Sequence, residues 1–141
     1  MLSRIFETTS EEETIALGHE LALELNGCVL LIGNLGAGKT TFTKGIVAGL
    51  GVASGSDVTS PTFTLIHQYA QNVFHIDLYR LDEPHEIETL GLDELFDSGA
   101  LVILEWAERF PALLPTIRTE IRIESLGDDS RRITIETLEA R

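Results

Sequence analysis

The sequence predicts an α/β fold, in which a sheet with a parallel core carries antiparallel strands at its edges and helices on its faces. The runs CVLLI (28–32) and ALVILE (100–105) are continuously apolar, as in strands buried on both faces of a parallel sheet. In contrast, EIRIES (120–125) and RRITIET (131–137) alternate with period two around LGDD. This alternation predicts a closing antiparallel hairpin with one solvent-exposed face.

The remaining elements are expected in chain order. RIFETT (4–9) is typical of a short strand, and a helix is then expected from Ser10 to about Leu25. Ser10 can cap this helix while Glu13, three residues later, bonds back to it. FTLIHQY and VFHIDLY, separated by AQN, predict a hairpin. Residues 82–99 predict two short helical pieces divided by Gly91.

A complete phosphate-loop motif follows the first apolar run. GNLGAGKT (33–40) matches G-x-x-x-x-G-K-[ST], and a helix is predicted after it over residues 39–50. Such a loop binds phosphates with backbone N–H groups, and the dipole of the helix points at the same anion. Gly33, Gly36 and Gly38 permit the close approach because they lack a Cβ and can adopt positive φ. The sequence therefore predicts a P-loop NTPase-like three-layer sandwich.

Five side chains indicate the chemistry expected at this loop. Lys39 should reach the β- and γ-phosphates, the Thr40 hydroxyl should ligate Mg²⁺, and Thr41 should add a phosphate contact. A second magnesium anchor is usually an acid at the end of a neighbouring apolar strand, and both Asp77 and Glu105 stand at such ends. Each acid has a structural alternative: a turn cap for Asp77 and a strand-end salt bridge for Glu105.

Other polar and aromatic positions leave two interpretations open. Thr59, Ser60 and Thr62 in DVTSPTF either sense the γ-phosphate, as in nucleotide switches, or belong to an ordinary proline turn. Trp106 is either a core or edge aromatic or a residue of the site. His75 shares a strand face with Asp77, which permits a role in the site without requiring one. The chain has no Asn-Lys-x-Asp stretch, the usual guanine-recognition motif, so ATP is favoured over GTP.

Length and composition narrow the class of protein. The 141 residues fit one domain, residues 1–141, and 43% of them are apolar. Ten basic and 23 acidic residues give a net charge of −13, which disfavours stand-alone binding to nucleic acid. The single cysteine, Cys28, excludes an internal disulfide and is expected to be inert core. No apolar run approaches the ~20 residues of a membrane span, and the first residues lack a secretory stretch, so we expect a cytoplasmic protein with no membrane partner.

Four segments together resemble one protein family. GNLGAGKTTFTKGI, SPTFTLIHQY, HIDLYRL and LGLDELF followed by ALVILEW occur in the order and spacing of the TsaE family, the small bacterial ATPases of tRNA threonylcarbamoyladenosine synthesis. The resemblance covers roughly residues 4–137, and the combination of SPTFTL, DLYRL and LEW is far narrower than the phosphate loop alone. It implies slow, Mg²⁺-dependent ATP hydrolysis in support of the TsaB–TsaD pair, which transfers a threonylcarbamoyl group to adenosine 37 of tRNA. The chain would then meet tRNA only through that complex.

The resemblance also assigns roles to individual residues. It implies nucleotide contacts at Gly36, Ala37, Gly38, Lys39, Thr40 and Thr41, and magnesium ligation by Thr40 and Glu105. Gly33, the first glycine of the loop, is a further nucleotide contact that the motif itself predicts. Asp77 matches an acid near the γ-phosphate that holds the metal shell or the attacking water, so the expected catalytic residues are Lys39, Asp77 and Glu105. Ser10 falls at a further nucleotide contact. Arg131 is our choice for a late contact, with Arg132 as the alternative because the LGDDSRR turn varies in length.

Two other functions are weighed against an ATPase that serves a partner complex. A small-molecule kinase of this fold needs an acceptor pocket and usually an arginine-bearing lid, for which 141 residues leave little room. A non-catalytic nucleotide-dependent module would keep Gly38 and Lys39 but could dispense with Asp77 and Glu105. Both acids are present, which favours hydrolysis.

Overall fold

The computed structural model describes residues 2–34, 36–52, 66–81 and 91–138. Its strands are β1 (Leu2–Thr8), β2 (Cys28–Ile32), β3 (Ile66–Ala70), β4 (Val73–Asp77), β5 (Leu101–Glu105), β6 (Arg118–Gly127) and β7 (Ser130–Leu138). Its α-helices are α1 (Glu11–Leu21), α2 (Lys39–Leu50) and α4 (Leu92–Asp97). The short 3₁₀ turns are η1 (Ala22–Glu24), η4 (Ala107–Arg109) and η5 (Pro111–Leu113).

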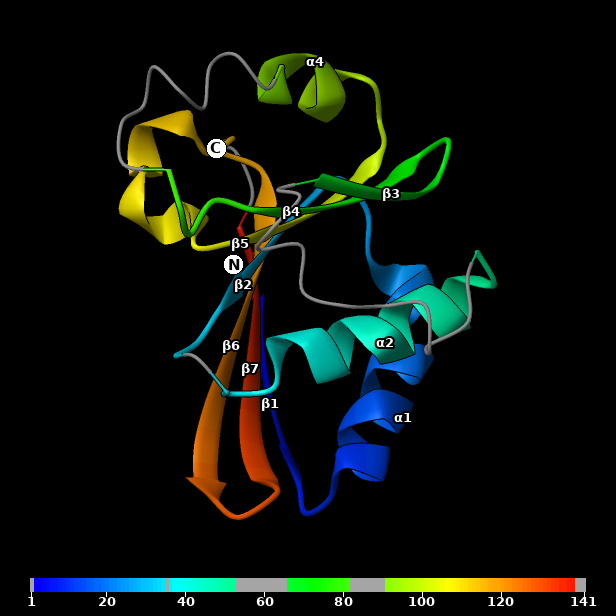
Figure 1. Ribbon diagram of the computed structural model, residues 1–141, viewed down its shortest axis with the longest axis vertical. Helices are drawn as coiled ribbons and strands as arrows, with labels where there is room; N and C mark the ends of the chain where they lie inside the picture. The colour runs from blue at the N-terminus through cyan, green and yellow to red at the C-terminus, as the bar shows by residue number, and fades with distance from the viewer. Residues whose placement is uncertain (1, 35, 53–65, 82–90, 139–141) are drawn as a thin grey trace.

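The strands form one mixed sheet in the order β1-β7-β6-β2-β5-β4-β3 (Figure 1). β2 pairs in parallel with both β5 and β6, and β4 pairs in parallel with β5. β7 and β1 extend the sheet antiparallel beyond β6, and β3 closes the other edge antiparallel to β4. The predicted parallel core with antiparallel edges is confirmed, as are both predicted hairpins.

Helical layers cover both faces of the sheet. α1 and α2 pack side by side on one face, while α4, η4 and η5 cover the other face near β4 and β5 (Figure 1). The predicted three-layer α/β arrangement is therefore present among the described elements.

The core lies on both sides of the sheet because the central strands are apolar throughout. Along β2, Val29 and Leu31 face the α1–α2 layer, while Cys28 and Leu30 face the α4 layer. Cys28 is buried, and this burial raises the pKa of its thiol to about 12. The thiolate is the reactive form, so the expectation of an inert core cysteine agrees with its position.

The start of α1 departs from the prediction in one detail. Ser10 caps the helix as expected, its Oγ accepting from the backbone N–H of Glu13 at 3.1 Å. The Glu13 carboxylate, however, bonds to Thr9, accepting from its backbone N–H at 2.5 Å and from its hydroxyl at 2.7 Å. The reciprocal bond to Ser10 itself is therefore replaced by one to the preceding residue. The helix also changes to the 3₁₀ form after Leu21, before the predicted end at Leu25.

Parts of the prediction lie outside the described residues. Thr59, Ser60 and Thr62 fall within residues 53–65, and the first of the two helical pieces falls within residues 82–90. The second piece is confirmed as α4, which begins after Gly91 at a φ of 71°. No helix within the described ranges is long and apolar enough to cross a membrane.

Candidate nucleotide-binding site

The phosphate loop connects β2 to α2, and its glycines serve two different needs. Gly36 and Gly38 have φ of 79° and 113°, a left-handed region that strains other residues, and Gly38 is the N-cap of α2. Gly33 instead needs space, because an added Cβ would lie 2.7 Å from the carbonyl oxygen of Ile123 in β6. The loop thus keeps a backbone cradle at a helix N-terminus, which is the environment that phosphate groups require.

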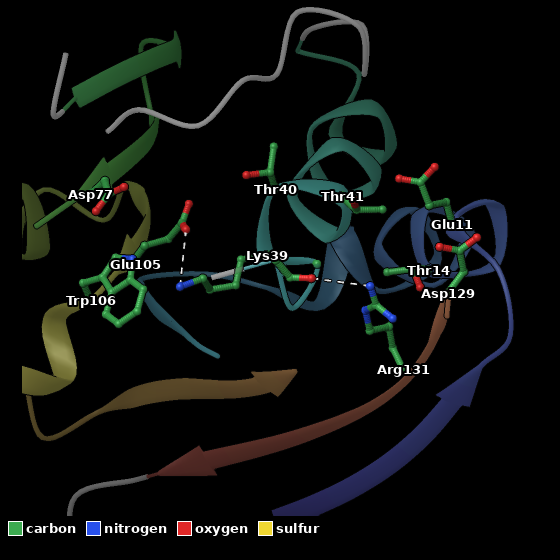
Figure 2. A pocket seen from close by; sticks show the side chains of 12 residues that line it. Glu11, Thr14, Lys39, Thr40, Thr41, Asp77, Glu105, Trp106, Asp129 and Arg131 are labelled. Carbon is green, nitrogen blue, oxygen red and sulfur yellow. Dashed lines mark hydrogen bonds and ion pairs between the residues drawn. The ribbon is translucent and has the colours of Figure 1, made fainter. Parts of the chain in front are cut away.

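A cavity of about 320 Å³ opens beside this loop, where β4 and β5 end (Figure 2). Asp77 and Glu105 are the last residues of these two parallel strands and are register partners, so both carboxylates reach the same edge of the sheet. The cavity is lined by Glu11, Thr14, Gly36, Gly38, Lys39, Thr40, Thr41, Asp77, Glu105, Trp106, Asp129 and Arg131. The chain thus brings most of the predicted site residues together from four separate parts of the sequence.

Lys39 begins α2, and its ammonium group is surrounded by fixed partners. Nζ donates a 2.8 Å hydrogen bond to the carbonyl of Gly33 and lies 3.9 Å from Oε1 of Glu105. It also lies 3.8 Å from the centroid of the Trp106 ring, a cation–π geometry. Burial lowers the pKa of Lys39, and the negative charges of Glu105, Glu108 and Asp77 oppose that shift. The ammonium is therefore a desolvated cation in the loop, where a phosphate would interact strongly with it.

The two acids show both the expected placement and the structural alternatives. Oδ1 of Asp77 accepts a 2.8 Å hydrogen bond from the backbone N–H of Tyr79, which is the turn cap. Glu105 makes the ion pair with Lys39 and, through Oε2, a 2.5 Å hydrogen bond with Nε2 of His75. Both acids also line the cavity, so the structural and functional interpretations hold together for each residue.

Arg131, at the start of β7, links the closing hairpin to the phosphate loop. Its Nε donates to the carbonyl of Ala37 at 2.6 Å, and one terminal nitrogen donates to the carbonyl of Gly36 at 3.4 Å. Arg132 points away and pairs with Glu7 of β1 at 3.0 Å. Of the two arginines that the sequence left open, Arg131 is therefore the one that lines the cavity.

Three predicted nucleotide contacts do not line this cavity. Ser10 is occupied as the cap of α1, and Glu11 and Thr14 line the cavity in its place. Gly33 and Ala37 border a second cavity on the β6 side of the loop, and each contributes a backbone carbonyl to the site's hydrogen bonds. Their predicted contacts stay predictions.

Three further residues line the cavity without having been expected from the sequence: Glu11, Thr14 and Asp129. Glu11 and Thr14 are three apart on one face of the helix that starts just after Ser10. The nucleotide contact expected at Ser10 therefore indicated that these two residues would also lie near the site. Asp129 lies two residues before Arg131 in the turn between β6 and β7. Asp129 is exposed in that turn, and no motif or periodicity in the sequence indicates that it lines a cavity.

The metal-binding groups present suit magnesium. Thr40 and Glu105 both line the cavity, next to the loop that would hold the phosphates. Among the described residues, no group of three or more His, Cys, Asp or Glu side chains could hold a metal by itself. Mg²⁺ is usually bound by one or two protein oxygens together with substrate phosphates and water, so the groups that line the cavity fit it.

Comparisons with known proteins point to a single family. A family model described as threonylcarbamoyl adenosine biosynthesis protein TsaE matches residues 8–133. A Bacillus subtilis (strain 168) protein named tRNA threonylcarbamoyladenosine biosynthesis protein TsaE is 44% identical over 134 residues, covering 92% of this chain and 82% of that protein. A Rickettsia bellii protein of the same name is 41% identical over 131 residues, covering 89% of this chain and 90% of its own.

A solved structure agrees with these relatives. A crystal structure of Bacillus subtilis YdiB superposes with a TM-score of 0.77 at 36% identity, over 98% of this chain and 87% of that chain. The family model spans the phosphate loop, both strand-end acids and Arg131. The mixed sheet and the cavity at the phosphate loop agree with these matches, which show that the chain belongs to the TsaE family of threonylcarbamoyl adenosine biosynthesis proteins.

Proposed function

We propose that this chain hydrolyses ATP with Mg²⁺ and thereby serves the TsaB–TsaD transferase pair in threonylcarbamoylation of tRNA. The observation that supports the proposal most is the meeting of the phosphate loop with two buried strand-end acids, Asp77 and Glu105, in one cavity. A module that only bound nucleotide would need the loop and its lysine but not both acids. The names of the relatives supply the connection to threonylcarbamoyladenosine.

The proposed roles follow from where each group lies. The loop N–H groups and the Lys39 ammonium bind the phosphates and balance their charge. Thr40 and Glu105 would hold Mg²⁺, which when bound neutralises charge on the phosphates. Asp77, buried and fixed by the Tyr79 backbone N–H, holds the metal's water shell or orients the attacking water. None of these roles requires an acceptor substrate, because water receives the phosphoryl group.

The first experiment measures phosphate release from ATP and Mg²⁺ by the purified chain without any acceptor. We expect slow release that needs Mg²⁺ and that increases when the purified TsaB–TsaD pair is added. Release that appears only with a small-molecule acceptor would favour the alternative of a P-loop kinase. Nucleotide binding without release, alone or with the pair, would favour a binding module.

The second experiment measures binding of the TsaB–TsaD pair to this chain with ATP, with ADP and without nucleotide. We expect the tightest binding with ATP. Linkage then requires the pair to tighten ATP binding by the same factor, which calorimetry with a non-hydrolysable analogue can measure. Equal binding in every nucleotide state, with an unchanged hydrolysis rate, would contradict the proposed partner mechanism.

A further inference from the structure

Glu105 is held at both of its oxygens by side chains that are themselves buried. Oε1 lies 3.9 Å from Nζ of Lys39, and Oε2 lies 2.5 Å from Nε2 of His75 (Figure 2 shows the Lys39 side). Glu105 is 3% exposed and His75 is fully buried, so solvent has almost no part in orienting this carboxylate. Its rotation is set by these two side chains.

His75 lies behind the cavity and does not line it. It stands two residues before Asp77 on β4, and its register partner on β5 is Ile103, two residues before Glu105. His75 and Glu105 are therefore diagonal neighbours on one face of the sheet. The imidazole does not line the cavity, and its hydrogen bond to Glu105 connects it to the site.

Within the described part of the chain, Glu105 is the hydrogen-bond partner of the His75 ring. Its Nδ1 is buried and has no hydrogen-bond partner among the described residues, while Nε2 bonds to the carboxylate. Because a carboxylate oxygen only accepts, Nε2 carries the proton and donates. The ring is packed by His67 and Tyr69 of β3, with ring centroids 6.4 Å and 6.3 Å away. These neighbours restrict its rotation and so keep Nε2 aimed at Glu105.

We propose that His75 is the positioning residue of the magnesium site: it fixes Oε2 of Glu105 and so leaves Oε1 turned toward Lys39 and the cavity. This inference rests on the proposed function, in which Glu105 is a magnesium ligand. A donor behind a ligating carboxylate sets which oxygen faces the ion and lowers the cost of ordering it. An imidazole placed only to fill the core would not need its one bonded nitrogen to be aimed at this carboxylate.

Two substitutions at this position separate hydrogen bonding from packing. His75→Phe keeps a planar ring of similar size but has no N–H for Glu105. His75→Gln loses the ring but keeps an amide N–H donor that reaches about as far as Nε2. His67→Phe is the matched control, because it removes a neighbouring imidazole that packs on His75 and makes no bond to Glu105.

The readout is the Mg²⁺ concentration needed for half-maximal binding of a non-hydrolysable ATP analogue, measured by titration calorimetry. Loss of such a supporting partner weakens a metal site by about ten- to a hundredfold, so His75→Phe should raise this concentration about tenfold or more. His75→Gln should recover most of the loss, and His67→Phe should behave like wild type. A His67→Phe variant as impaired as His75→Phe would assign the effect to packing and overturn the proposal.

Glu105→Ala, measured alongside, separates failure of this inference from failure of the proposed function. If Glu105→Ala leaves the Mg²⁺ dependence of binding unchanged, Glu105 is not a magnesium ligand. The role that the proposed function gives to Glu105 is then wrong. If Glu105→Ala impairs the dependence but folded His75→Phe does not, only the positioning role of His75 is overturned.

A spectroscopic test on the wild-type chain covers the case in which His75→Phe fails to fold. Long-range ¹H–¹⁵N correlation spectra show which nitrogen of each imidazole carries the proton, and the His75→Gln spectrum identifies the signals of His75. We expect a proton on Nε2, with shifts that move in Glu105→Gln and on addition of Mg²⁺ with the ATP analogue. A His75 imidazole protonated on Nδ1 alone would overturn the proposal. So would His75 signals whose shifts stay the same both in Glu105→Gln and after addition of Mg²⁺ with the ATP analogue.

Discussion

Lys39 shows how a single side chain can connect the phosphate loop to the acids across the cavity. Its ammonium bonds the carbonyl of Gly33, pairs with Glu105 and lies over the Trp106 ring. Each of these contacts is one that a phosphate oxygen could complement or replace, because all of them stabilise positive charge. The functional value of the residue therefore lies in its charge and its reach.

We expect Lys39→Ala to remove most triphosphate binding. Losing a hydrogen bond to a charged group costs on the order of 1.5–3 kcal/mol. That cost is a loss of affinity of roughly ten- to over a hundredfold. Titration calorimetry with a non-hydrolysable ATP analogue measures it. Lys44→Ala, which removes the same charge from α2 away from the cavity lining, is the control and should bind like wild type. Unchanged affinity in Lys39→Ala would contradict the phosphate-loop assignment.

Replacing each of the two strand-end acids should impair a different property of the site. Glu105→Ala should weaken the Mg²⁺ dependence of nucleotide binding, because it removes a metal anchor. Asp77→Ala should spare binding more and reduce turnover, because its role is nearer the γ-phosphate. Binding and single-turnover hydrolysis across a range of Mg²⁺ concentrations distinguish the two effects. An Asp77→Ala variant that hydrolyses ATP at the wild-type rate would show that the role given to Asp77 is wrong.

The sequence located the residues of a contiguous motif better than the contacts between strands. Lys39, Thr40 and Thr41 follow from the phosphate loop, whose spacing is a property of the backbone itself. The bond between His75 and Glu105 could not be found in this way. It depends on β4 pairing in parallel with β5 in one register, and a register is fixed by packing between segments that are far apart in the chain.

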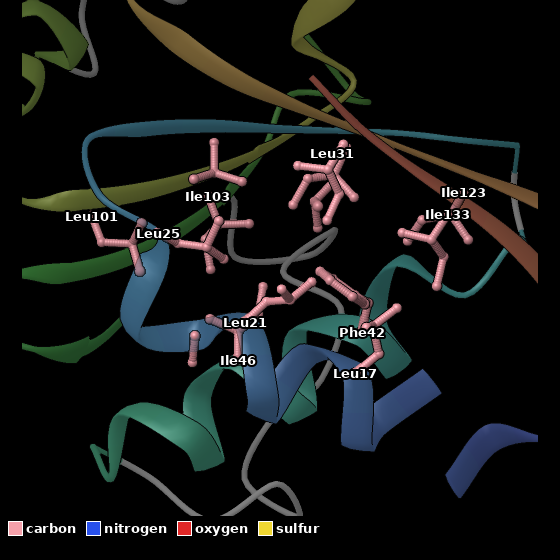
Figure 3. Close-up of a cluster of buried hydrophobic side chains, with 14 of the residues drawn as sticks. Leu17, Leu21, Leu25, Leu31, Phe42, Ile46, Leu101, Ile103, Ile123 and Ile133 are labelled. Atoms are coloured by element: carbon pink, nitrogen blue, oxygen red, sulfur yellow. The ribbon is translucent and has the colours of Figure 1, made fainter. Parts of the chain in front are cut away.

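The backbones of the two long helices, α1 and α2, approach each other closely at glycines. An added Cβ on Gly45 of α2 would overlap the carbonyl oxygen of Ile15 in α1 and would lie 2.9 Å from the backbone nitrogen of His19. This close approach brings the apolar side chains of both helices under the sheet, as Figure 3 shows for Leu17, Leu21, Phe42 and Ile46. Because α2 begins at Lys39, the same packing also sets the position of the phosphate loop.

We expect Gly45→Ala to destabilise the protein although alanine is the better helix former. Helix propensity alone would stabilise by about 1 kcal/mol. The new methyl group meets backbone atoms that cannot rotate away, and overpacking of this kind costs about 1–3 kcal/mol or more. Urea unfolding followed by circular dichroism measures the balance. A midpoint higher than that of wild type would show that α1 and α2 do not pack this closely.

Element types were predictable from periodicity, but strand order was not. The apolar runs identified β2 and β5, and period-two alternation identified β6 and β7, because each pattern reports burial on two faces or on one. The position of β6 beside β2, rather than beside another core strand, is set by contacts over the whole sheet. The end of α1 was overestimated because its apolar pattern continues through η1 while the backbone tightens.

At the scale of the whole molecule, charge limits the kind of partner. A net charge of −13 repels the phosphate backbone of tRNA, so contact with tRNA is expected only through another protein. A partner with a basic surface is compatible with the same charge, and its association would be faster at low salt.

We therefore expect no tRNA binding by this chain alone. A gel-shift titration with unmodified tRNA at physiological salt should show no complex, because counterion release supplies most non-specific affinity and an acidic surface offers little of it. Adding the TsaB–TsaD pair should bring this chain into a tRNA-containing complex, which antibody detection on the same gel can follow. A salt-sensitive complex formed by this chain with tRNA alone would contradict the expectation.

The order of the strands has a consequence for how the chain is made. β2, which leads into the phosphate loop, lies between β5 and β6, and both of these strands are synthesised much later. At the other edge, β7 is the one described strand that pairs with β1, so Leu2 meets Thr137, far along the sequence. During translation the loop therefore leaves the ribosome long before the strands that hold it in place. Proteins are made from the N-terminus, so a nascent chain that ends before β6 carries the complete motif without the folded cradle.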